Sequence, residues 1–110
     1  MSLNRKSQWM VDNCYQGFKR FNPSDTITKY SEGDDTMCLR WEKNGRLYRI
    51  YKFHAGWSGD LTRLTIHGVN AVGEYNAMSK SGVAFGIRIS SLKMKEGPDG
   101  QYVEVVLGSY

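Results

Sequence analysis

The sequence predicts an α+β domain in which an N-terminal helix packs on a twisted, mostly antiparallel sheet of about five strands. Three observations predict it: apolar residues at helical spacing near the start, an Asn-Gly pair between two β-prone segments, and alternating apolar residues further on. The pattern lacks strand-helix-strand alternation, so neighbouring strands are expected to run antiparallel. A small, partly open barrel capped by the helix is the alternative arrangement.

The helix is predicted from about Ser7 to Phe21. Its apolar residues recur at i, i+3, i+4 and i+7, the spacing that lines one helix face: Val11, Cys14, Tyr15 and Phe18. Polar side chains occupy the other side: Asp12, Asn13, Gln16, Lys19 and Arg20. Asn22-Pro23 ends the helix, because proline excludes the α conformation from the residue before it and lacks a backbone donor.

A β-hairpin is predicted around Lys43-Asn44-Gly45-Arg46, between strands at Thr36 to Glu42 and Leu47 to His54. A type I′ turn needs positive φ at both central residues, and Asn-Gly tolerates this best. If Asn44-Gly45 is the turn, Trp41 faces Tyr48 and Arg40 faces Arg49 on the opposite side of the sheet.

The rest of the chain predicts short strands joined by glycine-rich turns. An extended piece is expected at Thr26 to Tyr30, and further strands at Leu61 to Val69, Val83 to Ser90 and Tyr102 to Leu107. Gly97-Pro98-Asp99-Gly100 is expected to be a turn. Between these elements, Glu74 to Met78 reads as a short strand or a turn, and Ser79-Lys80-Ser81-Gly82 as a loop.

Length and composition indicate a single domain, residues 1–110. At 110 residues, with 40% hydrophobic and 13% aromatic residues, the chain can build one core but not two. It has no run of roughly 20 apolar residues that would span a bilayer and no signal-peptide pattern at its start, so we expect a cytoplasmic protein without a membrane partner.

The cysteines and histidines do not predict a metal site. Cys14 and Cys38 lack Cys-x-x-Cys spacing, and we expect two free thiols. Tetrahedral zinc needs four ligands, whereas the chain has two Cys and two His far apart in sequence. The sequence also contains no cofactor-binding motif, so neither a metal nor a cofactor is expected.

The net charge of +4 and a pI near 9.1 favour an anionic partner. Like charges opposite one another destabilise a sheet, so Arg40 beside Arg49 calls for a neutralising partner. Glu42, diagonal to Arg49, can supply it. In the alternative interpretation the hairpin surface binds phosphate or another anion, through these residues: Arg40, Arg49, Tyr51 and Lys52, with Lys43 and Arg46 near the edge.

Two further segments carry tryptophan where a partner could meet it. The loop from His54 to Asp60 combines Trp57 with two glycines, and loops of this kind often bind partners. Its alternative role is structural, with Trp57 folded back onto the core and Asp60 capping a turn. Trp9 lies off the main helix stripe, where it either serves a subunit contact or, as we expect, closes the edge of the core.

We expect a binding protein rather than an enzyme, and three functions remain open. The first is a module that binds an anionic macromolecule, foremost nucleic acid, through the basic sheet surface and the Trp57 loop. The second is a protein-interaction module, either an inhibitor or an accessory subunit, that binds through Trp57 and Trp9. The third is a small nuclease that uses His54 and His67 as general acid and base. The size and basic balance are typical of small phage or bacterial accessory proteins.

Overall fold

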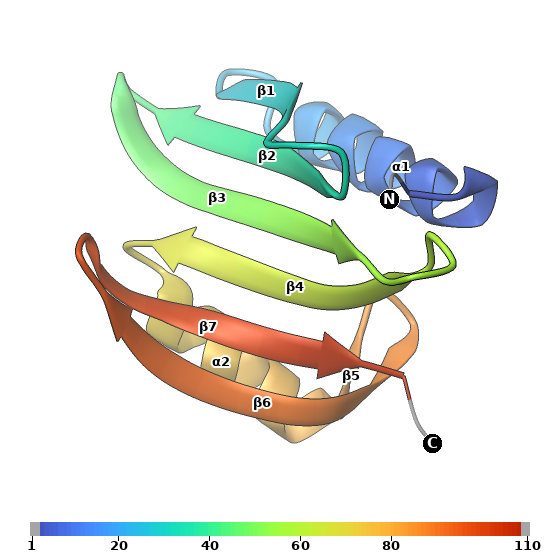
Figure 1. Ribbon diagram of the computed structural model, residues 1–110. Helices are drawn as coiled ribbons and strands as arrows, with labels where there is room; N and C mark the ends of the chain where they lie inside the picture. The colour runs from blue at the N-terminus through green and yellow to red at the C-terminus, as the bar shows by residue number, and fades with distance from the viewer. Residues whose placement is uncertain (1–2, 109–110) are drawn as a thin grey trace.

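The computed structural model describes residues 3–108, which form two helices and seven strands (Figure 1). In chain order these are α1 (Arg5–Phe21), β1 (Thr26–Ser31), β2 (Thr36–Lys43), β3 (Arg46–Ala55), β4 (Leu61–Gly68), α2 (Ala71–Ser81), β5 (Val83–Ala84), β6 (Ile87–Gly97) and β7 (Gly100–Leu107).

The strands form one curled antiparallel sheet in the order β1-β2-β3-β4-β7-β6-β5. Both helices lie on the same face of it: α1 beside β1 and β2, and α2 behind β6 and β7 in the view of Figure 1. The other face carries no helix among the described residues. The predicted α+β class and antiparallel sheet are confirmed, but the sheet has seven strands rather than about five, and a second helix is present.

The core lies between the sheet and the two helices. Leu39, Tyr51, Ile66 and Val103 come from four neighbouring strands, are aligned by the strand register, and are all buried. The helices complete this layer with Val11 and Met78. Because side chains alternate along a strand, the residues between these buried ones point to the helix-free face.

Helix α1 agrees with the sequence prediction, although it begins two residues earlier, at Arg5. The side-chain oxygen of Asn4 accepts a hydrogen bond of 2.9 Å from the Ser7 amide and so caps the first turn. Val11 is fully buried, and the other stripe residues pack around it. No helix within residues 3–108 is long and apolar enough to cross a membrane.

Helix α2 corrects the predictions of a short strand or turn at Glu74 to Met78 and a loop at Ser79 to Gly82. The segment has weak intrinsic helix signals, because Gly73 and two serines lower its propensity. Burial of Ala71 and Met78 against the sheet stabilises the helix instead. Gly82 then ends it at a φ of 73°, with its amide bonded to the Met78 carbonyl.

The strand predicted at Val83 to Ser90 is interrupted by a tight turn. Phe85 and Gly86 have φ values of 52° and 77°, which separate the two-residue β5 from β6. Phenylalanine rarely adopts positive φ, so no local signal predicts this turn. The ring of Phe85 packs 5.5 Å from that of Phe53, which compensates for the unfavourable backbone. The other predicted strands, the Asn44-Gly45 hairpin and the Gly97 to Gly100 turn are confirmed.

The two cysteines are free thiols, as expected. Cys14 is half-buried on α1, whereas Cys38 is buried on β2. Burial raises the pKa of Cys14 to about 11, so its thiol stays protonated and unreactive near neutral pH.

Candidate functional site

A β-bulge in the β2-β3 hairpin decides which residues share a face. The predicted register holds at Glu42, which pairs with Leu47, but it shifts by one residue between Trp41 and Glu42. Beyond the bulge Arg40 pairs with Ile50, and Arg49 pairs with Trp41. The predicted pairing of Arg40 with Arg49 is therefore wrong, because the extra residue on β3 turns Arg49 toward the helices.

Arg49 is enclosed on the helix side by charge and aromatic rings. Its Nη1 lies 2.7 Å from Glu74 Oε1 on α2, and its two Nη atoms donate hydrogen bonds to the hydroxyls of Tyr51 and Tyr48. The guanidinium also lies over the ring of Trp41, 5.3 Å from the centroid. Burial, with the Glu74 carboxylate nearby, raises the pKa of Tyr51. Arg49 and Tyr51 therefore belong to the core, where Glu74 neutralises the charge of Arg49.

The remaining cations of the predicted surface are mostly paired. Lys52, on the helix-free face, lies 3.0 Å from Glu32, and Lys43 lies 3.6 Å from Asp25. Arg40 is more loosely placed, 3.9 Å from Glu42, the carboxylate that the structural interpretation offered as a neutralising partner. Arg46 is exposed beside the hairpin turn. Two more ion pairs on the helix-free face share one carboxylate, since Arg63 and Lys95 both contact Glu104.

The helix-free face contains a hollow of about 400 Å³ that both histidines line. The ring nitrogens of His54 lie 3.3 Å from the Thr36 hydroxyl and 3.2 Å from the Thr65 hydroxyl. Burial lowers the pKa of His54 to about 4, and the positive charge of Arg63 acts in the same direction. His67 stacks on Tyr102, with 4.7 Å between the ring centroids, and burial lowers its pKa as well.

The positions of the histidines do not favour the nuclease interpretation. His67 is opposite Ile50, and His54 lies four residues further along β3, which separates the two positions by about 13 Å along the strand. One scissile phosphate cannot be within hydrogen-bond reach of both rings at that separation. His54 is also neutral near pH 7 and occupied by two hydroxyl partners.

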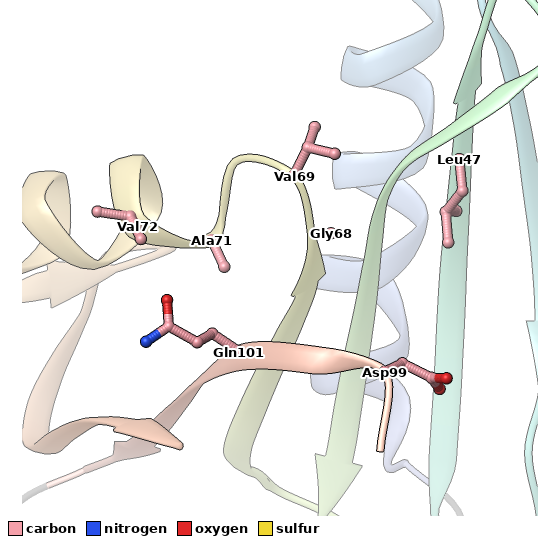
Figure 2. Close-up of a pocket in the computed structure, with 7 residues that line it drawn as sticks. All are labelled: Leu47, Gly68, Val69, Ala71, Val72, Asp99 and Gln101. Carbon is pink, nitrogen blue, oxygen red and sulfur yellow. The ribbon is translucent and has the colours of Figure 1, made fainter. Parts of the chain in front are cut away.

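A second hollow, also of about 400 Å³, opens where the start of β3, the end of β4 and the β6-β7 turn meet (Figure 2). Its walls are mainly aliphatic or small: Leu47, Gly68, Val69, Ala71 and Val72. Gln101 and Asp99 line the opposite side in Figure 2, and Asp99 supplies the one charged side chain of the lining. An apolar wall with a single carboxylate does not suit an anionic ligand.

The outer face of α1 differs from all these surfaces. With about 3.6 residues per turn, the side away from Val11 carries Arg5, Lys6, Trp9, Asn13, Gln16 and Arg20, and Lys19 borders it, about 80° around the helix from Val11. All seven side chains are exposed to solvent. We call this set the outer face of α1. It presents cations, side-chain amides and one large ring on a rigid helix of 17 residues.

The cations of the outer face of α1 equal the net charge of +4 in number. These four cations form no ion pair within residues 3–108, although Lys6 is near enough to Asp60 to help lower the pKa of that carboxyl. The single acid of the helix, Asp12, is bound to Lys29 at 2.7 Å. The chain has 15 Lys and Arg and 11 Asp and Glu, so setting these four cations aside leaves the rest neutral.

Trp57 projects from a short loop beside the first turn of α1. The loop is held by hydrogen bonds from the Asn4 amide to the Gly59 carbonyl (2.8 Å) and from the Asn4 side chain to Asp60 (2.7 Å). Trp57 is nevertheless 90% exposed, and Trp9 is 65% exposed. Both structural expectations, Trp57 folded onto the core and Trp9 closing its edge, are therefore wrong.

No known protein guides the interpretation, because no family model, curated protein or solved structure matches this chain. The signals for the outer face of α1 were visible in the sequence, as a polar helix side and an excess of basic residues between positions 1 and 30. Only the structure separates these cations from their counter-ions.

Proposed function

We propose that the protein is a non-enzymatic module that binds nucleic acid through the outer face of α1, with Trp57 at the margin of the contact. The observation that carries the proposal is the location of the net charge. Four exposed cations that form no ion pair within residues 3–108 lie on this one helix: Arg5, Lys6, Lys19 and Arg20.

This distribution suits a polyanion better than a small anion. Cations spread over about 20 Å of helix can each contact a different phosphate. In a site for a small anion, by contrast, the binding side chains converge on one point. Phosphate contacts supply most of the affinity in such complexes and make it depend on salt. Trp9 adds an aromatic surface within the same face, which can pack against sugars or bases.

The helix-free sheet surface supports this function less well, even though the sequence pointed to it. Lys52, Arg63 and Lys95 on that face are each within 3.4 Å of a carboxylate. A phosphate would have to displace these carboxylates and meet their repulsion. The sheet surface therefore serves as the comparison in the experiment.

The test is fluorescence-polarisation binding to labelled single-stranded and double-stranded oligonucleotides across a salt series. With three to four phosphate contacts, the logarithm of the affinity is expected to fall with the logarithm of salt concentration with a slope of about −3. A variant with Arg5, Lys6, Lys19 and Arg20 all changed to Gln is expected to lose binding. The matched control changes Arg40, Lys52, Arg63 and Lys95 to Gln and should retain at least a third of the affinity.

Three results would contradict the proposal. One is the absence of salt-sensitive binding by the wild-type protein at 50 mM salt. Another is equal affinity of the α1 variant and the wild type. The third is binding to vesicles rich in anionic lipid without binding to oligonucleotides, which would assign the basic helix to a membrane surface. Circular dichroism of both variants confirms that any loss is not unfolding.

A protein partner is the second candidate, because exposed tryptophan on a hydrogen-bonded loop is typical of interface centres. Trp57 and Trp9 would then form the contact, with an affinity that survives moderate salt. Changing Trp57 to Ala should weaken a captured complex at least tenfold, whereas the four-cation variant of α1 should leave it intact. Binding that is lost in the four-cation variant of α1 but kept in Trp57→Ala would favour nucleic acid.

A further inference from the structure

We infer that α1 is a recognition helix for the major groove of double-stranded DNA. The inference rests on the proposed function and names the form of nucleic acid that the outer face of α1 fits. It depends on the types of side chain in that face and on their order around the helix.

The centre of the outer face carries side chains that read base edges. Opposite Val11, around the helix, lie Trp9, Asn13, Gln16 and Arg20. Side-chain amides bind the N6 and N7 edge of adenine in the major groove, and arginine binds the O6 and N7 edge of guanine. The indole of Trp9 offers an apolar contact for the methyl group of thymine. Asn13, Gln16 and Arg20 have no hydrogen-bond partner within residues 3–108 that would occupy them.

The margins of the same face carry cations that fit the two walls of a groove. Arg5 and Lys19 lie on one side of the central stripe, about 60° and 100° from its centre with Asp12 between them, and Lys6 lies about 40° from its centre on the other side. A groove is bounded by one phosphate backbone on each side, so a helix lying in it needs charge on both margins. Arg5 and Lys6 therefore flank the line opposite Val11 on its two sides, which matches the charge that a major-groove helix needs.

The dimensions agree with this placement. Positions 5 to 20 extend over about 22 Å, roughly six base pairs of duplex. The B-form major groove is about 12 Å wide and admits one α-helix, whereas the major groove of an RNA duplex is too deep and narrow. In Figure 1 α1 lies at the margin of the molecule, and the side chains of its outer face are exposed to solvent. The Trp57 loop, joined to Asn4, lies at the start of the helix, where it can meet the adjacent backbone.

The experiment compares the affinity for three duplexes of one sequence: B-form DNA, the same DNA with its major groove filled by glucosylated 5-hydroxymethylcytosine, and RNA. We expect at least tenfold tighter binding to the unmodified DNA.

A second experiment selects bound sequences from 30-base-pair duplexes with a random centre, with the wild-type protein and with variants. It identifies the residues of α1 that contact base pairs. Asn13→Ala and Gln16→Ala should each lower the preference for the selected base, at one base pair of the DNA site, by about 5- to 100-fold. Lys19→Gln should lower the salt slope by about 1 and keep the preference.

Equal affinity for the three duplexes, or tighter binding to single strands, would overturn the inference while the proposed nucleic-acid function stands. The same holds if the selected sequence is unchanged in both amide variants although the protein binds duplex. If no oligonucleotide of any form binds, both the inference and the proposed function fail. Lys52→Gln, on the helix-free face, is the control and should match wild type in affinity and preference.

Discussion

Arg49 on β3 and Glu74 on α2 form an ion pair, with 2.7 Å between Nη1 and Oε1, that joins the sheet to the second helix. Their side chains are only 14% and 21% exposed. The Tyr51 hydroxyl donates a further hydrogen bond to Glu74, so the carboxylate serves both β3 side chains. The two residues are 25 positions apart in sequence, which makes the pair a long-range determinant of where α2 packs.

The first prediction concerns this pair. Glu74→Ala leaves a largely buried guanidinium without its carboxylate, and should lower the free energy of unfolding by about 2 kcal/mol. Urea unfolding followed by circular dichroism measures it. Glu42→Ala, which removes the looser partner of Arg40, is the control and should change the free energy by less than about 0.5 kcal/mol. Equal effects of the two variants would show that the Arg49-Glu74 pair is not a stabilising contact.

The hairpin shows how far the sequence could predict the site. Asn44-Gly45 gave the turn correctly, because its signal is local and both residues adopt positive φ, 52° and 77°. The bulge between Trp41 and Glu42 has no such local signal. The bulge is favoured by the contacts that Arg49 makes on the helix side, including the ion pair with Glu74. Glu74 lies on α2, a helix that the sequence pattern did not indicate. A one-residue shift then moved Arg49 and Tyr51 from the expected binding surface into the core.

The helix shows the complementary case. The stripe around Val11 is periodic, and periodicity predicted α1 and its buried face. The same periodicity also defines the opposite face, where Lys19 and Arg20 lie. What it could not predict is which cations find carboxylates: Lys29 binds Asp12 and Lys52 binds Glu32, across 17 and 20 residues. Those pairings depend on the tertiary fold, and none of them involves the four cations of the outer face of α1.

The second prediction is a pH dependence that originates at His54. Its pKa is about 4 in the folded protein, against an ordinary value of 6.5, because burial disfavours the charged ring. The unfolded chain therefore binds more protons between these values, and the stability contributed by neutral His54 is complete above pH 6.5 and lost as pH falls toward 4. Allowing for partial exposure, the loss is about 2 kcal/mol.

Urea unfolding of wild type and His54→Gln at pH 7 and pH 4.5 measures this effect. The carboxylates titrate in both proteins, so their contribution cancels in the comparison. The variant should lose less stability than wild type on acidification. If both proteins lose the same amount, His54 does not titrate with a lowered pKa.

The third prediction concerns Asn4, which caps α1 and holds the Trp57 loop. Asn4→Ala removes the hydrogen bonds to the Ser7 amide and to Asp60, and should lower the free energy of unfolding by about 1 kcal/mol. Amide hydrogen exchange across 56–60 should also become faster. Asn76→Ala, at an exposed position of α2, is the control and should leave that exchange unchanged. Unaltered exchange in Asn4→Ala would mean that the loop is held without the Asn4 side chain, by its internal bonds and the backbone bond to Gly59.

The most direct test of the central claim, that the outer face of α1 meets nucleic acid, uses the three tryptophan indole N–H signals in a ¹⁵N–¹H NMR titration with a DNA duplex. Trp9 lies within that face, Trp57 lies beside the first turn, and Trp41 is buried with its indole bonded to Asp25 at 2.8 Å. The account predicts that the Trp9 signal shifts most, that Trp57 shifts less and that Trp41 stays in place. An unmoved Trp9 indole, with shifts in the same spectra confined to the backbone amides of Lys52, His67 and their neighbours on the sheet, would contradict it.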